Sequence, residues 1–190
     1  MTAGDPLGAL TGPGGPFEIV VEDVLGHPTQ VYKQRMRSLR ELMARNAGRL
    51  EVDWVVQGDR RFTFGEHDRQ ARVLARSLAD LGVARGDRVA LLSANVPEWV
   101  ITFWAVAILG ATLVPLNAWW KAEELEFGLE DSGAKVLIAD TRRLAVVADR
   151  LPAIAAPAHV FEIGSEPFSK LLAGDDPGFP ETPIDEDDLL

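Results

Sequence analysis

Residues that could carry acid–base or metal chemistry are scattered along this chain. The three histidines, His27, His67 and His159, lie far apart, and none has a second ligand at metal-binding spacing. We expect His67 on the surface, because it falls in the first turn of a predicted amphipathic helix. The chain has no cysteine, which excludes disulfides, thiolate metal ligands and a cysteine nucleophile. These residues therefore predict no metal site.

Five acids in the predicted helix 122–132 are the other candidates for catalysis. A pair of carboxylates does general acid–base work when its surroundings separate the two pKa values. No apolar pocket is evident around these acids, so we interpret them as the solvated outer side of the helix. They are Glu123, Glu124, Glu126, Glu130 and Asp131.

Two glycine-containing stretches are candidates for phosphate loops. The stretch 128–135, GLEDSGAK, is similar to a Walker sequence, but its lysine is one place late and no Ser or Thr follows. It also trails a predicted helix instead of a strand. The stretch 12–15 lies in a Gly/Pro-rich leader, and no G-x-G-x-x-G follows a predicted strand. The residues alone therefore show no active centre.

The stretch Arg88–Leu116 is the structural centre of the sequence. Val89–Leu92 is an apolar run typical of a strand buried on both faces. Trp99–Leu109, with Thr102 as its one polar residue, predicts a largely buried helix, and 111–115 predicts a second buried strand. A helix between two apolar strands indicates a right-handed parallel βαβ unit.

The ends of this helix carry start and stop signals. Asn95 and Glu98 have the spacing of a capping box, and Pro97 suits the first turn. Gly110 suits a left-handed helix stop. The alternative, a membrane span, needs about 20 apolar residues, and this run is far shorter. We therefore favour a buried core helix.

The flanking sequence extends the same architecture. Residues 54–57 and 60–63 predict a β-hairpin, followed by a helix with a Thr63–Glu66 capping box. Later strands are expected at 136–139 and 159–161, with helices between them. The predicted fold class is α/β: a doubly wound, mainly parallel sheet with helices on both faces, plus a small β-hairpin.

Composition divides the chain into three parts. Residues 1–16 hold five glycines and three prolines and predict a disordered leader. Residues 17–161 predict the α/β subdomain, with 17–34 draped over its surface. Residues 162–190 hold nine acids and one lysine, which indicates an acidic Pro/Gly-rich connecting segment. The net charge of −10 argues against nucleic acid as a partner.

A basic region surrounds a predicted helix start at Ser38–Glu41. Its side chains could contact acidic lipid or phosphate, although we favour a solvated helix face. No secretory signal is visible, so a cytoplasmic location is expected, with peripheral membrane association as the alternative. The basic residues are Lys33, Arg35, Arg37, Arg40, Arg45 and Arg49.

Four motifs in order resemble the opening region of the adenylate-forming (AMP-binding) enzymes, which include acyl-CoA synthetases, luciferases and peptide-synthetase adenylation domains. Phe62–Glu66 is similar to the family's Thr-Tyr-x-Glu start, and 82–89 to its Leu-Gly-x-x-x-Gly-Asp-Arg-Val turn. Leu109–Asn117 resembles Leu-Gly-Ala-x-x-Val-Pro-Leu-Asn, and Asp131–Lys135 matches Asp-Ser-Gly-Ala-Lys. The resemblance covers Ser38–Asp140 and is nearest to bacterial fatty-acid–CoA ligases.

The resemblance implies a reaction for the parent enzyme. A fatty or other carboxylic acid and ATP would give an acyl-adenylate and pyrophosphate, and CoA would then take the acyl group. ATP, Mg²⁺ and CoA are thus implied for the full-length enzyme and none of them for this chain. The family's phosphate loop, adenine-contacting segment, hinge and C-terminal domain with its adenylation lysine are all expected beyond Leu190. Lys121 departs from the family by replacing a helix-capping Thr or Ser.

We therefore expect this chain to be an N-terminal fragment that is inactive alone, with no catalytic, cofactor-binding or metal-binding residue. Trp119 and Trp120 could face the acyl or CoA side of the whole enzyme, although we favour a packing role. A fragment of a sheet leaves free strand edges, so self-association is expected. The alternative is a natural short binding or assembly module with the same fold.

Overall fold

The computed structural model describes residues 5–189 and divides them into two units. The larger unit consists of residues 39–184 with 188–189, and the smaller consists of residues 5–38 with Asp185–Asp187. Each unit is described by itself below. The βαβ region and everything built on it belong to the larger unit.

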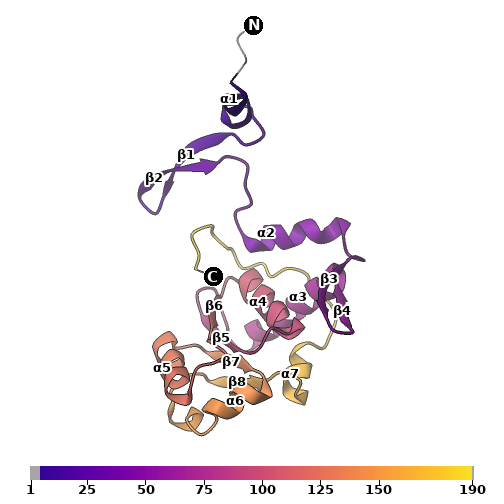
Figure 1. The fold of residues 1–190 in the computed structure, drawn as a ribbon, viewed down its shortest axis with the longest axis vertical. Helices are drawn as coiled ribbons and strands as arrows, with labels where there is room; N and C mark the ends of the chain where they lie inside the picture. Colours follow the sequence, from indigo (N-terminus) through magenta and orange to yellow (C-terminus); the bar gives the residue numbers. More distant parts are fainter. Residues whose placement is uncertain (1–4, 190) are drawn as a thin grey trace. The chain divides into compact units, whose positions relative to one another are not determined.

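A four-stranded parallel sheet lies at the centre of the larger unit (Figure 1). Its strand order is β6 (Thr112–Pro115), β5 (Arg88–Leu92), β7 (Val136–Ala139) and β8 (His159–Glu162). The strand β5 pairs with β6 on one side and with β7 on the other, so the chain reverses its direction of winding at β5. The predicted α/β fold with a parallel sheet is confirmed.

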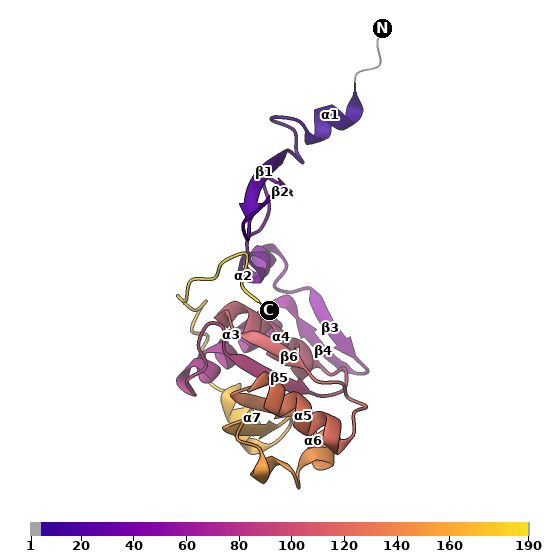
Figure 2. The same cartoon turned by 90° about the vertical axis from the view of Figure 1, so that its left-hand side faces the viewer.

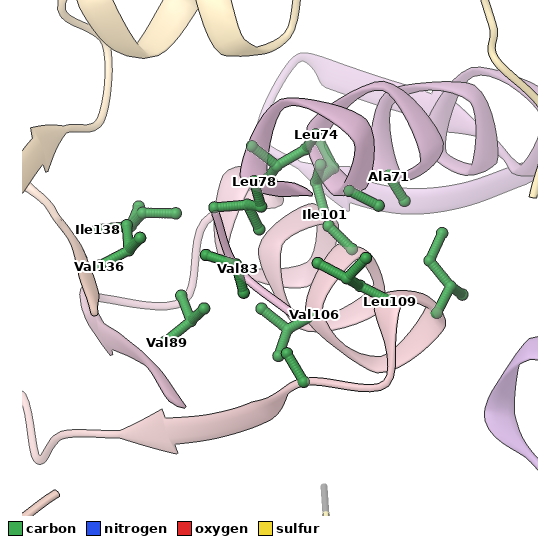
Figure 3. Close-up of a cluster of buried hydrophobic side chains, with 14 of the residues drawn as sticks. Ala71, Leu74, Leu78, Val83, Val89, Ile101, Val106, Leu109, Val136 and Ile138 are labelled. Atoms are coloured by element: carbon green, nitrogen blue, oxygen red, sulfur yellow. The ribbon is translucent and has the colours of Figure 1, made fainter. Parts of the chain in front are cut away.

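Side chains that alternate along the inner strands divide the core into two apolar layers. Val89 and Leu91 belong to the first layer with α3 (Phe64–Asp80) and α4 (Pro97–Leu109), and Figure 3 shows part of this layer. Ala90 and Leu92 belong to the second layer, with α5 (Ala122–Ser132) and α6 (Thr141–Val147). Helices therefore cover both faces of the sheet, as Figure 2 also shows.

The helix α4 begins one residue later than the capping-box signal predicted. Its N-cap is Val96, which makes no side-chain capping bond, so the predicted Asn95–Glu98 box is wrong. The carbonyl of Asn95 instead accepts a hydrogen bond of 2.9 Å from the Gln57 amide. Gly110 ends the helix with φ of 77°, as its sequence position predicted. No helix within residues 5–189 is both long and apolar enough to cross a membrane.

The hairpin before α3 confirms the sequence prediction. It pairs β3 (Asp53–Gln57) with β4 (Arg60–Thr63) in antiparallel register. Thr63 then caps α3, accepting from the Glu66 N–H at 3.2 Å, and the Glu66 carboxylate accepts from the Thr63 N–H at 2.9 Å. Upstream lie α2 (Leu39–Ala44) and a 3₁₀ turn, Arg45–Gly48.

His67 is buried, and the surface position predicted for it is wrong. Its side chain is 1% exposed, and its Nδ1 lies 2.9 Å from Oδ1 of the equally buried Asp68. Asn46 donates to the other oxygen of Asp68 at 3.0 Å. The reason is helical periodicity, because position 67 precedes the buried Ala71 and Leu74 by four and seven residues and so lies on the inward stripe.

The acidic segment after β8 contains a helix and contributes to the core. A 3₁₀ turn, Leu151–Ala153, precedes β8, and α7 (Glu166–Leu171) follows it. Phe168 on α7 is 1% exposed and belongs to the first core layer. The Leu171 carbonyl accepts a hydrogen bond of 2.8 Å from Ser77 on α3, so α7 is fixed to that helix.

The smaller unit contains a short helix and a hairpin. The helix α1 (Pro6–Thr11) lies inside the predicted disordered leader, and it has no buried residue; residues 1–4 of that leader lie outside the described range. The strands β1 (Ile19–Val24) and β2 (His27–Tyr32) pair through a two-residue turn. Both turn residues have positive φ, 51° for Leu25 and 82° for Gly26, the condition for a type I′ turn.

Most of the basic side chains named above have protein partners. In the smaller unit Arg35 and Arg37 both pair with Glu22, and their hydrogen bonds lower the pKa of its carboxyl to about 2. Both arginines also pair with Glu186, and Lys33 pairs with Glu18 at 2.9 Å. In the larger unit Arg40 donates to the carbonyls of Ile108 and Thr182. Four of the six basic side chains therefore bind groups of the protein itself.

Replacing Lys121 with Thr is expected to stabilise the larger unit by about 0.5–1 kcal/mol. Lys121 is the N-cap of α5 with extended backbone (φ −82°, ψ 171°), but its side chain makes no capping bond. Its N–H already donates to Glu124 Oε2 at 2.8 Å, so a threonine hydroxyl would complete a capping box. Urea unfolding of K121T and K121A, compared with the parent chain, measures the gain; equal stability of the two variants would contradict it.

Candidate functional site

The carboxyl ends of β5 and β7 form the point where the winding of the sheet reverses. From β5 the chain passes through α4 to β6 on one side, and it then crosses to β7 on the other side of β5. Ligands of open α/β sheets bind at the carboxyl ends of strands beside such a reversal. The loops that begin at Ser93 and Asp140 therefore mark the part of this unit to inspect for a site.

Asp140 joins these two strand ends. One of its oxygens accepts from the N–H of Ala94, just after β5, at 2.9 Å. Its carboxylate also accepts from the N–H of Arg143 at 2.9 Å and from the Arg143 guanidinium at 2.8 Å. Burial opposes ionisation of Asp140, but these donors outweigh it and keep the pKa of the carboxyl below its usual range. The ionised carboxylate of Asp140 thus links β5, β7 and α6 through hydrogen bonds.

Trp119 lies over Arg143 in the loop after β6. The guanidinium carbon is 5.8 Å from the centre of the indole ring, a cation–π distance. The N–H of Trp119 donates to the side chain of Asn117 at 2.9 Å, which fixes the loop. Residue Trp119 is 81% exposed. We call Trp119, Arg142 and Arg143 the Trp119 platform.

A small cavity opens beside the Trp119 platform. Its volume is about 180 Å³, and besides the platform it is lined by Ala118, Trp120 and Val146. The lining contains no carboxylate, thiol, hydroxyl or imidazole, so these side chains can bind and orient a group but offer no nucleophile or general base.

The two tryptophans singled out from the sequence have different roles. Trp120 is half-buried and packs against the second core layer, with ring atoms beside Gly128 of α5. The packing role expected for it is therefore what the structure shows. Trp119 is exposed and packs against no core layer.

The structure does not bring the other candidate residues together. His27 lies on β2, His67 on α3 and His159 on β8. Across residues 5–189 no three His, Asp or Glu side chains are grouped so that they could hold a metal ion. Gly128 lies inside α5 and Lys135 pairs with Asp87 at 2.5 Å, so the stretch 128–135 forms no phosphate loop. Of the five acids on α5, Glu123 and Glu126 pair with Arg150.

The sequence signal for Asp140 was available but incomplete. An acid directly after a buried strand is a typical site residue at the carboxyl edge of a parallel sheet. Its partner Ala94 could be named only once the order of β5 and β7 was known, whereas Arg143, three residues further on, is a local helix-capping partner. The aromatic contact of Arg143 with Trp119 depends on the same strand order.

The chain belongs to the family of AMP-binding enzymes, whose family model matches residues 39–190. Among curated relatives, the long-chain-fatty-acid–CoA ligase FadD13 of Mycobacterium tuberculosis is 45% identical over 80 residues, which cover 42% of this chain and 16% of that enzyme. Feruloyl-CoA synthase of Amycolatopsis sp. is 37% identical over 135 residues, covering 71% of this chain and 26% of the relative.

Solved structures agree with this assignment. The N-terminal domain of FACL13 from Mycobacterium tuberculosis has a TM-score of 0.72 and 31% identity, and the match covers 80% of this chain and 40% of that one. The anthranilate CoA ligase AuaEII, in complex with anthranoyl-AMP, has a TM-score of 0.76 and 26% identity, with 82% and 31% covered. The resemblance predicted from the sequence motifs is confirmed: this chain corresponds to the N-terminal part of acyl-CoA ligases.

Proposed function

We propose that this chain is the N-terminal part of an ATP-dependent acyl-CoA synthetase that acts on a fatty acid. In the proposed reaction the carboxylate attacks the α-phosphorus of ATP and pyrophosphate leaves; the CoA thiolate then attacks the acyl carbonyl and AMP leaves. The observation that carries the proposal is the family match over residues 39–190, together with an 80-residue match that covers 16% of the fatty-acid–CoA ligase relative.

In this proposal the described residues supply a scaffold rather than reacting groups. ATP, Mg²⁺ and CoA would supply the leaving group, the neutralising charge and the acyl acceptor. Within residues 5–189 no three His, Asp or Glu side chains are grouped so that they could hold a metal ion, and we derive no step through Mg²⁺. The contribution of this chain is a rigid carboxyl edge, fixed by Asp140 and displaying Trp119.

A chimera tests the proposal directly. Residues 39–190 of this chain would replace the matching N-terminal region of FadD13, chosen because it is 45% identical over 80 residues. We expect the chimera to form acyl-CoA from a long-chain fatty acid, and the 190-residue chain alone to form none. A chimera carrying Leu74→Asp in the core is the negative control, since a buried unpaired charge should prevent folding.

Either of two results would contradict the proposal. A folded but inactive chimera would argue that this chain is the alternative, a binding or assembly module. Acyl-CoA formation by the 190-residue chain alone would show that it is not a catalytically silent part. Reading the gene past the codon for Leu190 separates a fragment from a natural short chain.

We also propose that the 190-residue chain associates with itself. Among the described residues, β6 and β8 each have a partner strand on one side only, and Val160 on β8 is 39% exposed. Free edges of this kind pair with other chains. Sedimentation should show a mass that rises with concentration over the micromolar range, and a monomer throughout would contradict this.

A further inference from the structure

The hairpin of β1 and β2 (Figure 1) leaves the outer edge of β1 free. Directly before β1 begins, the carbonyl of Glu18 accepts a hydrogen bond of 2.8 Å from the Lys33 N–H, which follows β2. Hydrogen-bonded and non-hydrogen-bonded pairs alternate along antiparallel strands, so the backbone groups of every second residue after Glu18 point towards β2. The backbone groups of Ile19, Val21 and Asp23 therefore point outwards, and no residue within 5–189 binds them.

The outer edge of β2 is closed to pairing. Pro28 faces outwards on β2, opposite Asp23, and a proline has no N–H to donate. The outward carbonyl of Tyr32 already accepts a hydrogen bond of 2.7 Å from the Arg35 guanidinium. Proline on an edge strand is one of the ways in which proteins prevent an edge from pairing. Of the two edges of this hairpin, β1 is therefore the one that another strand can join.

The two faces of the hairpin also differ. One face carries the ion pairs of Glu22 described above. The other is apolar and open: Val21 is 65% exposed, Ile19 is 39% exposed, and Tyr32, which lies opposite Ile19, is 54% exposed. The ring of Phe17 meets that of Tyr32 edge-on, with 6.3 Å between their centres. A two-stranded hairpin is at best marginally stable in water, whereas three or more strands with an apolar face are stable. The hairpin thus has the free edge and the apolar face that a larger sheet uses.

A second copy of β1 fits this edge in one register. When two β1 strands pair antiparallel about a twofold axis at Val21, Ile19 of each copy lies opposite Asp23 of the other, so all the outward backbone groups are paired. Each acid of the strand then lies opposite an apolar residue, and no like charges meet. A parallel pairing in register would instead place each acid beside its own copy. The opposed pairs in the twofold register are Glu18 with Val24, Glu22 with Val20 and Asp23 with Ile19.

We propose that β1 is a homodimer interface, in which two copies of the chain pair their β1 strands about Val21 and form a four-stranded sheet in the order β2–β1–β1–β2. The paired edge is the same patch on both copies, as a twofold dimer requires. One pair of six-residue strands is smaller than a standard interface of about 1,200–2,000 Å². We therefore expect a weak dimer that depends on concentration. This interface is separate from the edges of β6 and β8, and it does not rest on the proposed reaction.

Oxidation of a single introduced cysteine tests the interface in the 190-residue chain, which has no cysteine of its own. In the proposed dimer the two residues at position 21 form a hydrogen-bonded pair with Cα atoms about 5.5 Å apart. A disulfide spans roughly 4.4–6.8 Å between Cα atoms. We expect Val21→Cys to form a covalent dimer at least about tenfold faster than Gln30→Cys. Gln30 is the matched control, since it is also exposed and lies opposite Val21 on the closed edge.

Hydrogen exchange followed by nuclear magnetic resonance tests the backbone contacts. The N–H groups of Ile19 and Asp23 should become protected as the concentration of the parent chain rises, because each would donate to the second copy. Val21→Pro removes an outward N–H and leaves the bonds between β1 and β2 in place, so it should abolish this protection. Gln30→Pro makes the same change on the closed edge and should keep the protection. The signals of β2 report whether the hairpin stays folded in each variant.

The outcomes support the β1 interface or overturn it. Faster crosslinking of V21C than of Q30C, together with protection of β1 that rises with concentration, supports the dimer. Equal crosslinking of the two cysteine variants overturns it, and so do outward N–H groups of β1 that exchange equally fast up to millimolar protein. Association of the parent chain without protection of β1 would assign the contact to the edges of β6 or β8 and overturn this interface. The crosslinking result stands even if V21P does not fold, because it uses a different variant.

Discussion

Replacing Phe168 with Ala is expected to lower the free energy of unfolding of the larger unit by about 3–5 kcal/mol. Phe168 is 1% exposed and belongs to the first core layer, so the substitution removes buried apolar surface and leaves a cavity. This loss is a large fraction of the roughly 5–15 kcal/mol that a typical domain has in total. Chemical denaturation followed by tryptophan fluorescence measures it.

The prediction has a matched control and a clear contrary result. Phe127→Ala makes the same chemical change at a residue that is 67% exposed, so it should cost little. If F168A is as stable as F127A, then α7 is not part of the folded core, and residues 162–190 behave as the connecting segment that their composition suggests. A loss of several kcal/mol in F168A alone would establish that the core extends past β8.

The case of α7 shows where sequence patterns fail. Phe168 stands in a segment of six helical residues, too short for a hydrophobic period to show against a background of acids, prolines and glycines. Its burial comes from tertiary contact with α3, to which Ser77 ties it. Composition describes the average of a segment, whereas the core needs only one side chain from it.

The sequence patterns did not predict the burial of His67 or the turn between β1 and β2, and the reasons differ. His67 lies on the same helical stripe as Ala71, Leu74 and Leu78, so the helical period alone predicts that His67 is buried. The surface position was predicted instead because the histidine side chain is polar. The hairpin turn instead uses Leu25 at φ of 51°, a conformation in which leucine is rare. No turn signal of the usual Asn-Gly or Asp-Gly kind was present to find.

The parts that sequence did predict are those in which local and tertiary preferences agree. The apolar run of β5 is buried on both faces, Gly110 adopts the left-handed conformation that a helix stop needs, and Thr63 and Glu66 form the expected capping box. At the candidate site the sequence identified Trp119 but not its partner, because Trp119 and Arg143 are 24 positions apart. Only the strand order of the sheet brings them together.

Replacing Asp140 with Ala is expected to lower the free energy of unfolding by about 2–4 kcal/mol at pH 7. The carboxylate caps α6 through the Arg143 N–H, a contact worth about 0.5–2 kcal/mol, and it accepts further charge-assisted bonds from Ala94 and the Arg143 guanidinium. The substitution also leaves the Arg143 side chain, 14% exposed, without a counter-charge. Because Asp140 ties β5 to β7 and binds the Arg143 guanidinium, D140A should also loosen the contact between Arg143 and Trp119.

The pH dependence of this difference separates the charge of Asp140 from its packing. Its donors keep the pKa of the folded carboxyl below the roughly 3.9 of an unfolded aspartate. A group with a lowered folded pKa stabilises the protein above its unfolded pKa, and that stabilisation is lost as the pH falls through the folded value. The gap in unfolding free energy between the parent chain and D140A should therefore be largest near neutral pH and shrink below about pH 4. The other acids are common to both chains, so their contributions cancel in this difference. If the difference in unfolding free energy stays constant down to pH 2, then Asp140 acts by its shape alone. Its charge would then hold neither Ala94 nor Arg143 in place.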